Sequence, residues 1–179
     1  QDVGFTQVVL ARELTLKEIQ QIASETDVAL EAFVHGALCV SYSGQCYLSA
    51  ALSGRSANRG ECAQYCRLPY TMVDANGKVI ASQKHLLSLR DMNRSDDLEA
   101  MMDAGISSFK IEGRLKDVSY VKNVTAWYRN KLDEILARRP EYIRASVGES
   151  RYTFTPQVAK SFNRGFTPFY LYGRNADVT

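Results

Sequence analysis

The sequence lacks the features that define several large classes of protein. No apolar run approaches the roughly 20 residues of a membrane-spanning helix, so we expect no membrane segment. The net charge is only +2 over 179 residues, and any basic surface must therefore be local. No internal repeat, low-complexity tract or secretory signal is visible. A content of 45% apolar and 23% charged residues is ordinary for a globular protein.

Recognisable peptidase motifs are also absent. The sequence contains no H-E-x-x-H helix, no G-x-S-x-G turn and no paired aspartate motif. It has only two histidines, His35 and His85. A cysteine peptidase would have to pair one of them with a thiol. We expect His85, which follows a hairpin pattern, to be a structural or surface residue.

Cysteine is scarce, but its distribution is uneven. All four cysteines, Cys39, Cys46, Cys62 and Cys66, lie within 28 residues in the spacing C-x6-C-x15-C-x3-C. This spacing leaves open a metal or iron–sulfur centre, buried structural thiols, or disulfides. We favour the metal centre, because the thiols lie in a Gly/Ser/Arg-rich loop over residues 36–69. The C-x2-C pairs of zinc knuckles are absent.

The first third of the chain predicts a parallel βαβ unit. Strand patterns over 5–11 and 27–36 flank a helix whose start has the capping-box spacing of Thr15 and Glu18. Its apolar stripe is Leu16, Ile19, Ile22 and Ala23.

The later elements continue the alternation. Residues 70–82 predict a hairpin around Asn76-Gly77. A helix opened by Ser95 has Leu98, Met101 and Met102 inward and ends at Gly105. A strand over 106–113 precedes a helix from Asp117 to just before Pro140, with a stripe of Val118, Val121, Val124, Tyr128, Leu132 and Ile135. The fold class is α/β. An eight-stranded barrel needs about 250 residues, so three strands of this kind would be under half of one.

One motif resembles the signature of the family called peptidase U32, or collagenase-like protease. Its fixed positions are Glu31, Phe33, Gly36, Ala37, Leu38, Cys39, Gly44, Cys46, Leu48 and Ser49. "SGRSANRGECAQYCRLPY" and "SSFKIEGRLKDVSYV" also resemble that family, over roughly residues 8–137. The resemblance implies the C-terminal part of a TIM-barrel-like (β/α) domain over 1–139, with a cysteine-rich loop and a β-hairpin insert. Residues 140–179 form an extended aromatic-rich tail or the start of a further domain.

The family name implies proteolysis, but better-studied branches resemble oxygen-independent hydroxylases of a ribosomal RNA cytidine, a tRNA uridine or the ubiquinone ring. Those branches use a [4Fe–4S] cluster on four cysteines. The resemblance therefore implies that Cys39, Cys46, Cys62 and Cys66 hold such a cluster, with zinc or empty thiols expected in a sample prepared in air. The long-form resemblance favours ribosomal RNA as substrate and a cytoplasmic location. A peptidase and a non-catalytic scaffold are the alternatives.

Several charged residues are candidate catalytic groups. Glu31 and His35 share one face of a predicted strand, with Phe33 between them. They are either functional groups beside the cluster or a hydrogen-bonded pair in the interior. Lys110, Glu112 and Arg114 alternate along the next core strand. Charges on one face of a core strand are costly unless they are paired or used. They predict either an ion network or a polar pocket for an anionic substrate.

Arginines in the predicted loops are candidate substrate contacts. Arg55, Arg59 and Arg67 lead this set, and Arg90, Arg94, Arg114 and Lys116 complete a basic rim that could hold RNA phosphates. Scattered solvated arginines are the alternative. The tail aromatics Phe166, Phe169, Tyr170 and Tyr172 could stack bases, or pack against the remainder of a longer protein.

A part-barrel would leave an apolar sheet face uncovered. Its expected residues are Val8, Val9, Leu30, Phe33, Phe109 and Ile111. We expect the chain either to self-associate through this face or to cover it with the tail, because uncovered strand edges and apolar patches promote association. We also expect that it lacks the N-terminal half of its domain.

Overall fold

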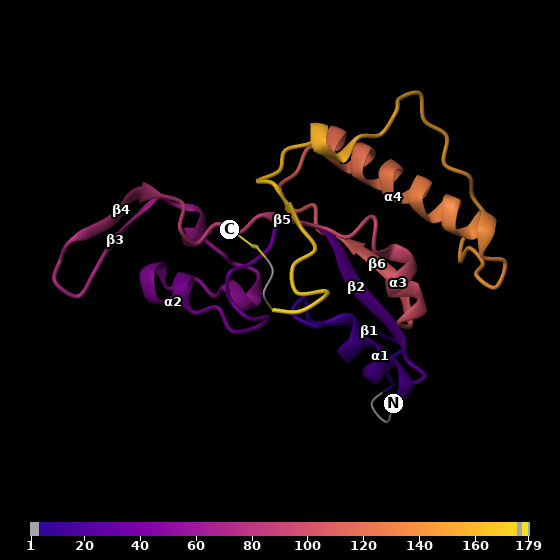
Figure 1. The fold of residues 1–179 in the computed structure, drawn as a ribbon, viewed down its shortest axis with the longest axis horizontal. Helices are drawn as coiled ribbons and strands as arrows, with labels where there is room; N and C mark the ends of the chain where they lie inside the picture. The colour runs from indigo at the N-terminus through magenta and orange to yellow at the C-terminus, as the bar shows by residue number, and fades with distance from the viewer. Residues whose placement is uncertain (1–3, 175–176, 179) are drawn as a thin grey trace.

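Three parallel strands form the centre of the fold (Figure 1) in a computed structural model that describes residues 4–174 and 177–178. Strand β2 (Ala29–Gly36) pairs in parallel with β1 (Gln7–Val9) and with β6 (Ile106–Ile111). Two short strands extend this sheet. β5 (Asp91–Asn93) runs antiparallel to the end of β2, and β7 (Phe166–Thr167) pairs in parallel with β5. The sequence patterns predict the first three strands and miss β5 and β7.

Helix α1 (Leu16–Ser24) connects β1 to β2 and confirms the predicted parallel βαβ unit. The Thr15 hydroxyl accepts the Glu18 N–H, and the Glu18 carboxylate accepts the Thr15 N–H at 2.7 Å. This reciprocal capping box satisfies two N–H groups at the start of the helix. Ile19 is buried against the sheet.

The two later helices depart in detail from their predictions. Helix α3 (Leu98–Asp103) begins after Asp97 rather than Ser95, because the Ser95 N–H donates to the Asn93 side chain instead. Ala104 is its C-cap, and Gly105 follows in a left-handed conformation.

Helix α4 (Val118–Arg138) begins after Asp117 as predicted, but the predicted inward stripe is wrong at its first turn. Val118 and Val121 are 68% and 48% exposed. Tyr120 is buried in their place, because its ring turns toward the core beside His35. Val124, Tyr128 and Ile135 are buried as predicted, and Leu132 packs against the core.

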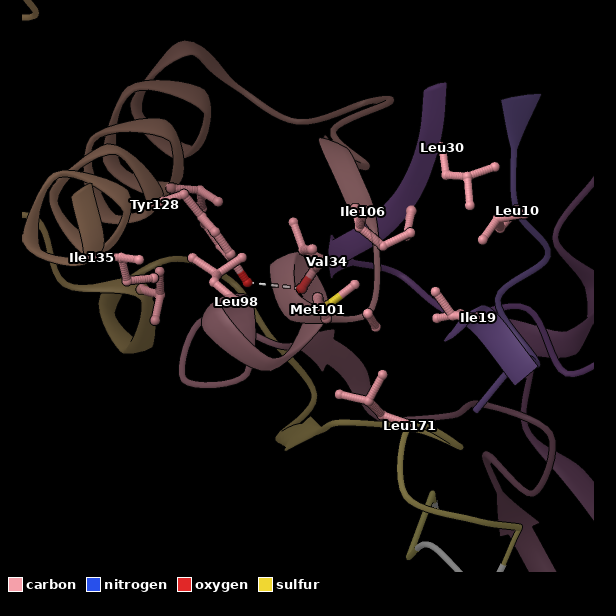
Figure 2. Close-up of a cluster of buried hydrophobic side chains, with 14 of the residues drawn as sticks. Leu10, Ile19, Leu30, Val34, Leu98, Met101, Ile106, Tyr128, Ile135 and Leu171 are labelled. Atoms are coloured by element: carbon pink, nitrogen blue, oxygen red, sulfur yellow. Dashed lines mark hydrogen bonds between the residues drawn. The ribbon is translucent and has the colours of Figure 1, made fainter. Parts of the chain in front are cut away.

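The main core lies between the sheet and these helices (Figure 2). Val34 from β2 lies beside Leu98 and Met101 from α3, and Leu30 from β2 lies near Leu10 and Ile106 in the same cluster. Leu171 from the C-terminal segment is completely buried in the same cluster. The tail therefore packs on this chain's own core, whereas Val8 and Val9 of the expected open face stay exposed. Coverage of that face by the tail or by a second copy stays a prediction.

The six residues expected on an open sheet face differ in their exposure. Leu30 is only 3% exposed, because its side chain points to the helices rather than to an open face. Val8 and Val9 are exposed as expected. Phe109 and Ile111 are partly buried against the main core, and Phe33 is partly buried against a smaller cluster around Met92.

The hairpin insert extends away from the rest of the fold, at the left of Figure 1. β3 (Tyr70–Val73) and β4 (Val79–Lys84) are antiparallel, as the Asn76-Gly77 pattern predicts. The cysteine-rich loop between β2 and β3 holds short helices at α2 (Leu48–Ser53), η1 (Ala57–Arg59) and η2 (Tyr65–Arg67). A further turn, η3 (Val158–Lys160), lies in the tail. Over the described residues, no helix has the length and apolar character to cross a membrane.

Candidate functional site

The carboxyl ends of the three parallel strands converge on one cavity of about 430 Å³. Arg12 follows β1, Cys39 follows β2, and Glu112 follows β6, and all three line the cavity. Cys46, Cys62 and Cys66 line it as well. Ligand sites of parallel α/β sheets lie at this end of the strands. The loop that gathers the thiols therefore stands where the sequence predicts a site.

Arg67 fixes the two ends of the cysteine loop. Its guanidinium donates to the Leu38 carbonyl at 2.5 Å, the Leu89 carbonyl at 3.3 Å and the Ser88 hydroxyl at 2.8 Å. The first of these bonds holds the backbone next to Cys39, and Arg67 itself follows Cys66 in sequence. Arg67 was predicted to contact substrate. It is half-buried, lines the thiol cavity and also positions the loop that carries the thiols, and its contact with substrate stays a prediction.

Polar side chains hold the middle of the same loop. The Cys46 N–H donates to the Asn58 side-chain oxygen at 3.2 Å, and the Ala63 N–H donates to the hydroxyl of the buried Ser49 at 3.1 Å. These bonds satisfy loop N–H groups that have no strand or helix partner. They hold the segment of Cys46 beside the segment of Cys62, which explains how a long loop keeps a defined shape.

The four thiols are all free and half-buried. Burial raises the pKa of the Cys66 thiol, and the charges of Cys39, Cys62 and Cys46 raise it further, while Arg67 opposes the shift. Cys66 therefore interacts with the other three cysteines across the cavity. In the described part of the chain, no three His, Cys, Asp or Glu side chains are close enough to share one metal ion.

Four arginines and one carboxylate complete the charged lining of the cavity: Arg12, Arg67, Arg114, Arg164 and Glu112. Arg164 comes from the tail, where its guanidinium pairs with the buried Asp91 at 3.1 Å. Sequence patterns miss Arg12 and Arg164, because only the tertiary fold brings them to the thiols. The lining suits a group of negative charge, since cations outnumber carboxylates there.

The predicted basic rim is only partly correct. Arg55 and Arg59 are exposed and do not line the cavity, although Ala57 and Asn58 between them do. Arg94 is 2% exposed, because its guanidinium binds the carbonyls of Phe33 and Pro168 inside the protein.

Glu31 and His35 do not form the predicted pair. A register shift between Phe33 and His35 interrupts the alternation of β2, and His35 contacts the rings of Tyr120 and Tyr128 on α4. Its Nδ1 lies 3.2 Å from the Tyr128 hydroxyl, and burial lowers the pKa of His35 to about 4.

Glu31 instead accepts a hydrogen bond from Ser108 at 2.7 Å and pairs with Lys110 at 3.3 Å. Its pKa is lowered, chiefly by the Ser108 hydrogen bond. Lys110 is therefore paired with the neighbouring strand rather than with Glu112. Strand β6 ends at Ile111, and the Glu112 carboxylate accepts the N–H of Arg114 in the loop beyond. Only Glu112 and Arg114 of the predicted triplet line the thiol cavity.

Within the described residues, no hydrogen bond joins either histidine to a thiol. The hydrogen-bonding partner of His35 is Tyr128, and the Nδ1 of His85 lies 2.9 Å from the Arg67 carbonyl. His85 is exposed, which agrees with its predicted surface role.

The fold and site define an α/β protein whose parallel strands present four free cysteines and four arginines around one cavity at their carboxyl ends. The chain belongs to peptidase family U32, whose family model matches residues 1–179. This match confirms the resemblance drawn from the motif around Cys39 and Cys46.

Curated relatives carry two kinds of name. The chain is 55% identical to the 23S rRNA 5-hydroxycytidine C2501 synthase of Escherichia coli (strain K12), over 99% of this chain and 27% of that protein. It is 34% identical to tRNA hydroxylation protein P1 of Bacillus subtilis (strain 168), over 98% of this chain and 44% of the relative. A collagenase of Porphyromonas gingivalis is 38% identical, over 82% of this chain and 39% of its own length. The chain thus spans less than half of each of these relatives. No solved structure gives a significant match.

Proposed function

We propose that this chain is the cysteine-bearing part of an enzyme that hydroxylates RNA, with a ribosomal RNA cytidine as the favoured target. The observation that carries the proposal is the convergence of all four cysteines and four arginines on one cavity. The 55% identity to a 23S rRNA 5-hydroxycytidine synthase supports the choice of substrate. The tRNA hydroxylation proteins support RNA as the substrate class. A cytoplasmic location is part of the proposal.

Cys39, Cys46, Cys62 and Cys66 would hold a [4Fe–4S] cluster. Thiolates are the ligands that iron–sulfur clusters use. A cubane cluster takes one thiolate at each of four iron corners, so its ligands stand farther apart than those of a single ion. The support from this chain is that all four thiols line one cavity. The cluster, when bound, supplies one-electron redox chemistry.

The chain's own residues would prepare the site around that group. Arg67 holds the loop backbone through the Leu38 and Leu89 carbonyls. Arg12, Arg114 and Arg164 bring positive charge to the cavity, which favours thiolates and an RNA phosphate. We also propose that β1, β2 and β6 belong to a (β/α) barrel, since their parallel order is that of neighbouring barrel strands.

Mass spectrometry of cellular RNA tests this function. Deleting the gene should remove one modification that has the mass of a single added oxygen atom. Wild-type protein should restore the mark, whereas Cys39→Ser should not. The matched control, Ser41→Ala, alters a neighbouring residue that does not line the thiol cavity and should restore the mark. An RNA profile that is identical with and without the gene would refute the proposal.

A peptidase is the second candidate, because two collagenases of Porphyromonas gingivalis are 38% and 35% identical to the chain. In the described part of the chain, the hydrogen bonds of His35 and His85 go to Tyr128 and Arg67, and none goes to a thiol. Cleavage of gelatin by pure protein, together with an unchanged RNA profile, would favour the peptidase. A protein that shows neither activity would be a scaffold.

A further inference from the structure

A second cavity, of about 610 Å³, lies beside the thiol cavity and has a different chemical character. Lys116, Lys122 and Lys160 line it, together with two exposed aromatic rings, Phe154 and Phe162. Leu115 lines both cavities, so the two hollows are neighbours on the surface. None of the charged groups that the sequence singles out as catalytic contributes to this second cavity.

The cavity is held together by contacts between α4 and the tail. The Asn123 side chain donates to the Gln157 carbonyl at 2.8 Å and to the Ser161 hydroxyl at 2.7 Å, and it accepts the Gln157 N–H at 2.8 Å. These three bonds keep η3, and with it Lys160, against the start of α4. The backbone position of Lys160 relative to α4 is thus fixed by the fold.

The positive charge of this cavity is not neutralised by the protein. Within residues 4–174 and 177–178, none of the three lysines forms an ion pair. Asp117 is the one acidic residue in the lining, and its carboxylate accepts the Tyr120 N–H at 2.7 Å as the cap of α4. Unpaired lysines gathered around a hollow suit a ligand that carries several negative charges.

Phe162 gives the cavity a second recognition element. Its ring is 62% exposed, and the cations of Lys116 and Arg164 lie 4.4 Å and 4.9 Å from its centre. Arg164 belongs to the lining of the thiol cavity, so Phe162 stands between the two sites. An exposed ring flanked by cations can stack a nucleic-acid base while the cations bind the adjoining phosphates.

We propose that this lysine–phenylalanine cavity binds a single-stranded RNA segment next to the nucleotide that enters the thiol cavity. The inference rests on the proposed RNA function and adds a separate binding site to it. Lys116, Lys122 and Lys160 bind consecutive phosphates, and Phe162 stacks one base. The path over Leu115 then leads the strand toward the cysteines.

RNA binding by purified protein tests the lysines. The probe is a fluorescently labelled single-stranded RNA of about 12 nucleotides, a length within the usual range of such sites. Binding is measured over a range of salt concentrations. The salt slope is the slope of the logarithm of the binding constant against the logarithm of the salt concentration. For a single strand, each lost phosphate contact reduces its magnitude by about 0.7. The triple Lys→Gln variant at 116, 122 and 160 should therefore bind more weakly, with a slope smaller by about 2. A control variant removes the same charge from exposed lysines that line neither cavity: Lys17, Lys78 and Lys84.

The ring is tested separately with Phe162→Ala, which should weaken binding about 10-fold or more while leaving the salt slope unchanged. Phe5→Ala is its matched control, because Phe5 is 65% exposed and lies outside both cavities. Equal affinity and equal slope in the cavity and control variants would overturn the inference. If those variants also modify RNA normally, the proposed RNA function is kept and the lysine–phenylalanine cavity is rejected as an RNA-binding site. A wild-type protein that binds no RNA would overturn both.

Discussion

The Tyr128 hydroxyl joins helix α4 to strands β2 and β5 inside the core, and its removal should be costly. It donates to the Val34 carbonyl at 2.7 Å, the bond drawn in Figure 2. It also lies 3.2 Å from His35 Nδ1 and accepts the Arg94 N–H at 3.3 Å. A further contact, at 3.1 Å, joins it to the Asn93 side-chain oxygen of β5. Tyr128→Phe keeps the ring and deletes these bonds. The Val34 carbonyl still accepts the Arg94 N–H at 2.9 Å, but the buried His35 Nδ1 loses its partner. A buried polar group left without its partner costs about 1–3 kcal/mol, so we expect the free energy of unfolding to fall by about 2 kcal/mol.

Urea denaturation measures this difference. For a domain of this size, a slope of about 2 kcal/mol per molar urea converts the loss into a midpoint lower by about 1 M. Tyr120→Phe is the matched control on the same helix, because the Tyr120 hydroxyl makes only a long 3.5 Å contact with the Glu112 carbonyl. It should cost well under about 1 kcal/mol. Equal midpoints for the two variants would refute the role assigned to Tyr128.

Three further outcomes follow from the geometry around the site. Burial lowers the pKa of His35 to about 4. Below the unfolded pKa of about 6.5, the folded state therefore binds fewer protons than the unfolded state. The free energy of unfolding should fall as the pH is lowered from about 6.5 to 4. Urea denaturation should show a free energy of unfolding about 2 kcal/mol lower at pH 5 than at pH 7. This difference should vanish in His35→Gln. Gly36→Ala should lower the free energy of unfolding by at least about 2 kcal/mol, because φ is +109° and the new Cβ would lie 2.4 Å from the Glu112 carbonyl oxygen. The control is Gly60→Ala, at φ +90° with open space around the new Cβ, which should lower it by less. Arg67→Lys keeps the charge but loses the planar guanidinium that binds the Leu38 carbonyl. After anaerobic reconstitution this variant should hold severalfold less iron than the wild type. An equal iron content would contradict the role of Arg67 in positioning the cysteine loop.

The elements that the sequence predicts correctly depend on contacts between residues that are close in the chain. The capping box of Thr15 and Glu18 fixes the start of α1 through contacts three residues apart. The Asn76-Gly77 pair marks the hairpin through its own turn preferences, with Gly77 at φ +80°. The position of the thiols at the end of β2 also follows from short-range order, because Cys39 is three residues beyond that strand.

Features that depend on distant contacts were missed or assigned wrongly. β5 is three residues long and pairs with β2 only through Asn93 and Met92, so it has no periodic signal of its own. The register shift before His35 turns that residue toward α4, against the strict alternation of a regular strand. Arg164 reaches the thiol cavity from the far end of the chain, and no local pattern predicts that placement.

Iron and acid-labile sulfide per chain, measured on the whole protein purified and reconstituted without air, test the central claim most directly. Four thiols around one cavity should bind about four iron and four sulfide, and the protein should be brown. Cys62→Ala should lose most of both, whereas Ser41→Ala should load like wild type. Stoichiometric zinc without iron under the same conditions, or no metal at all, would contradict the assignment of these cysteines to a [4Fe–4S] cluster.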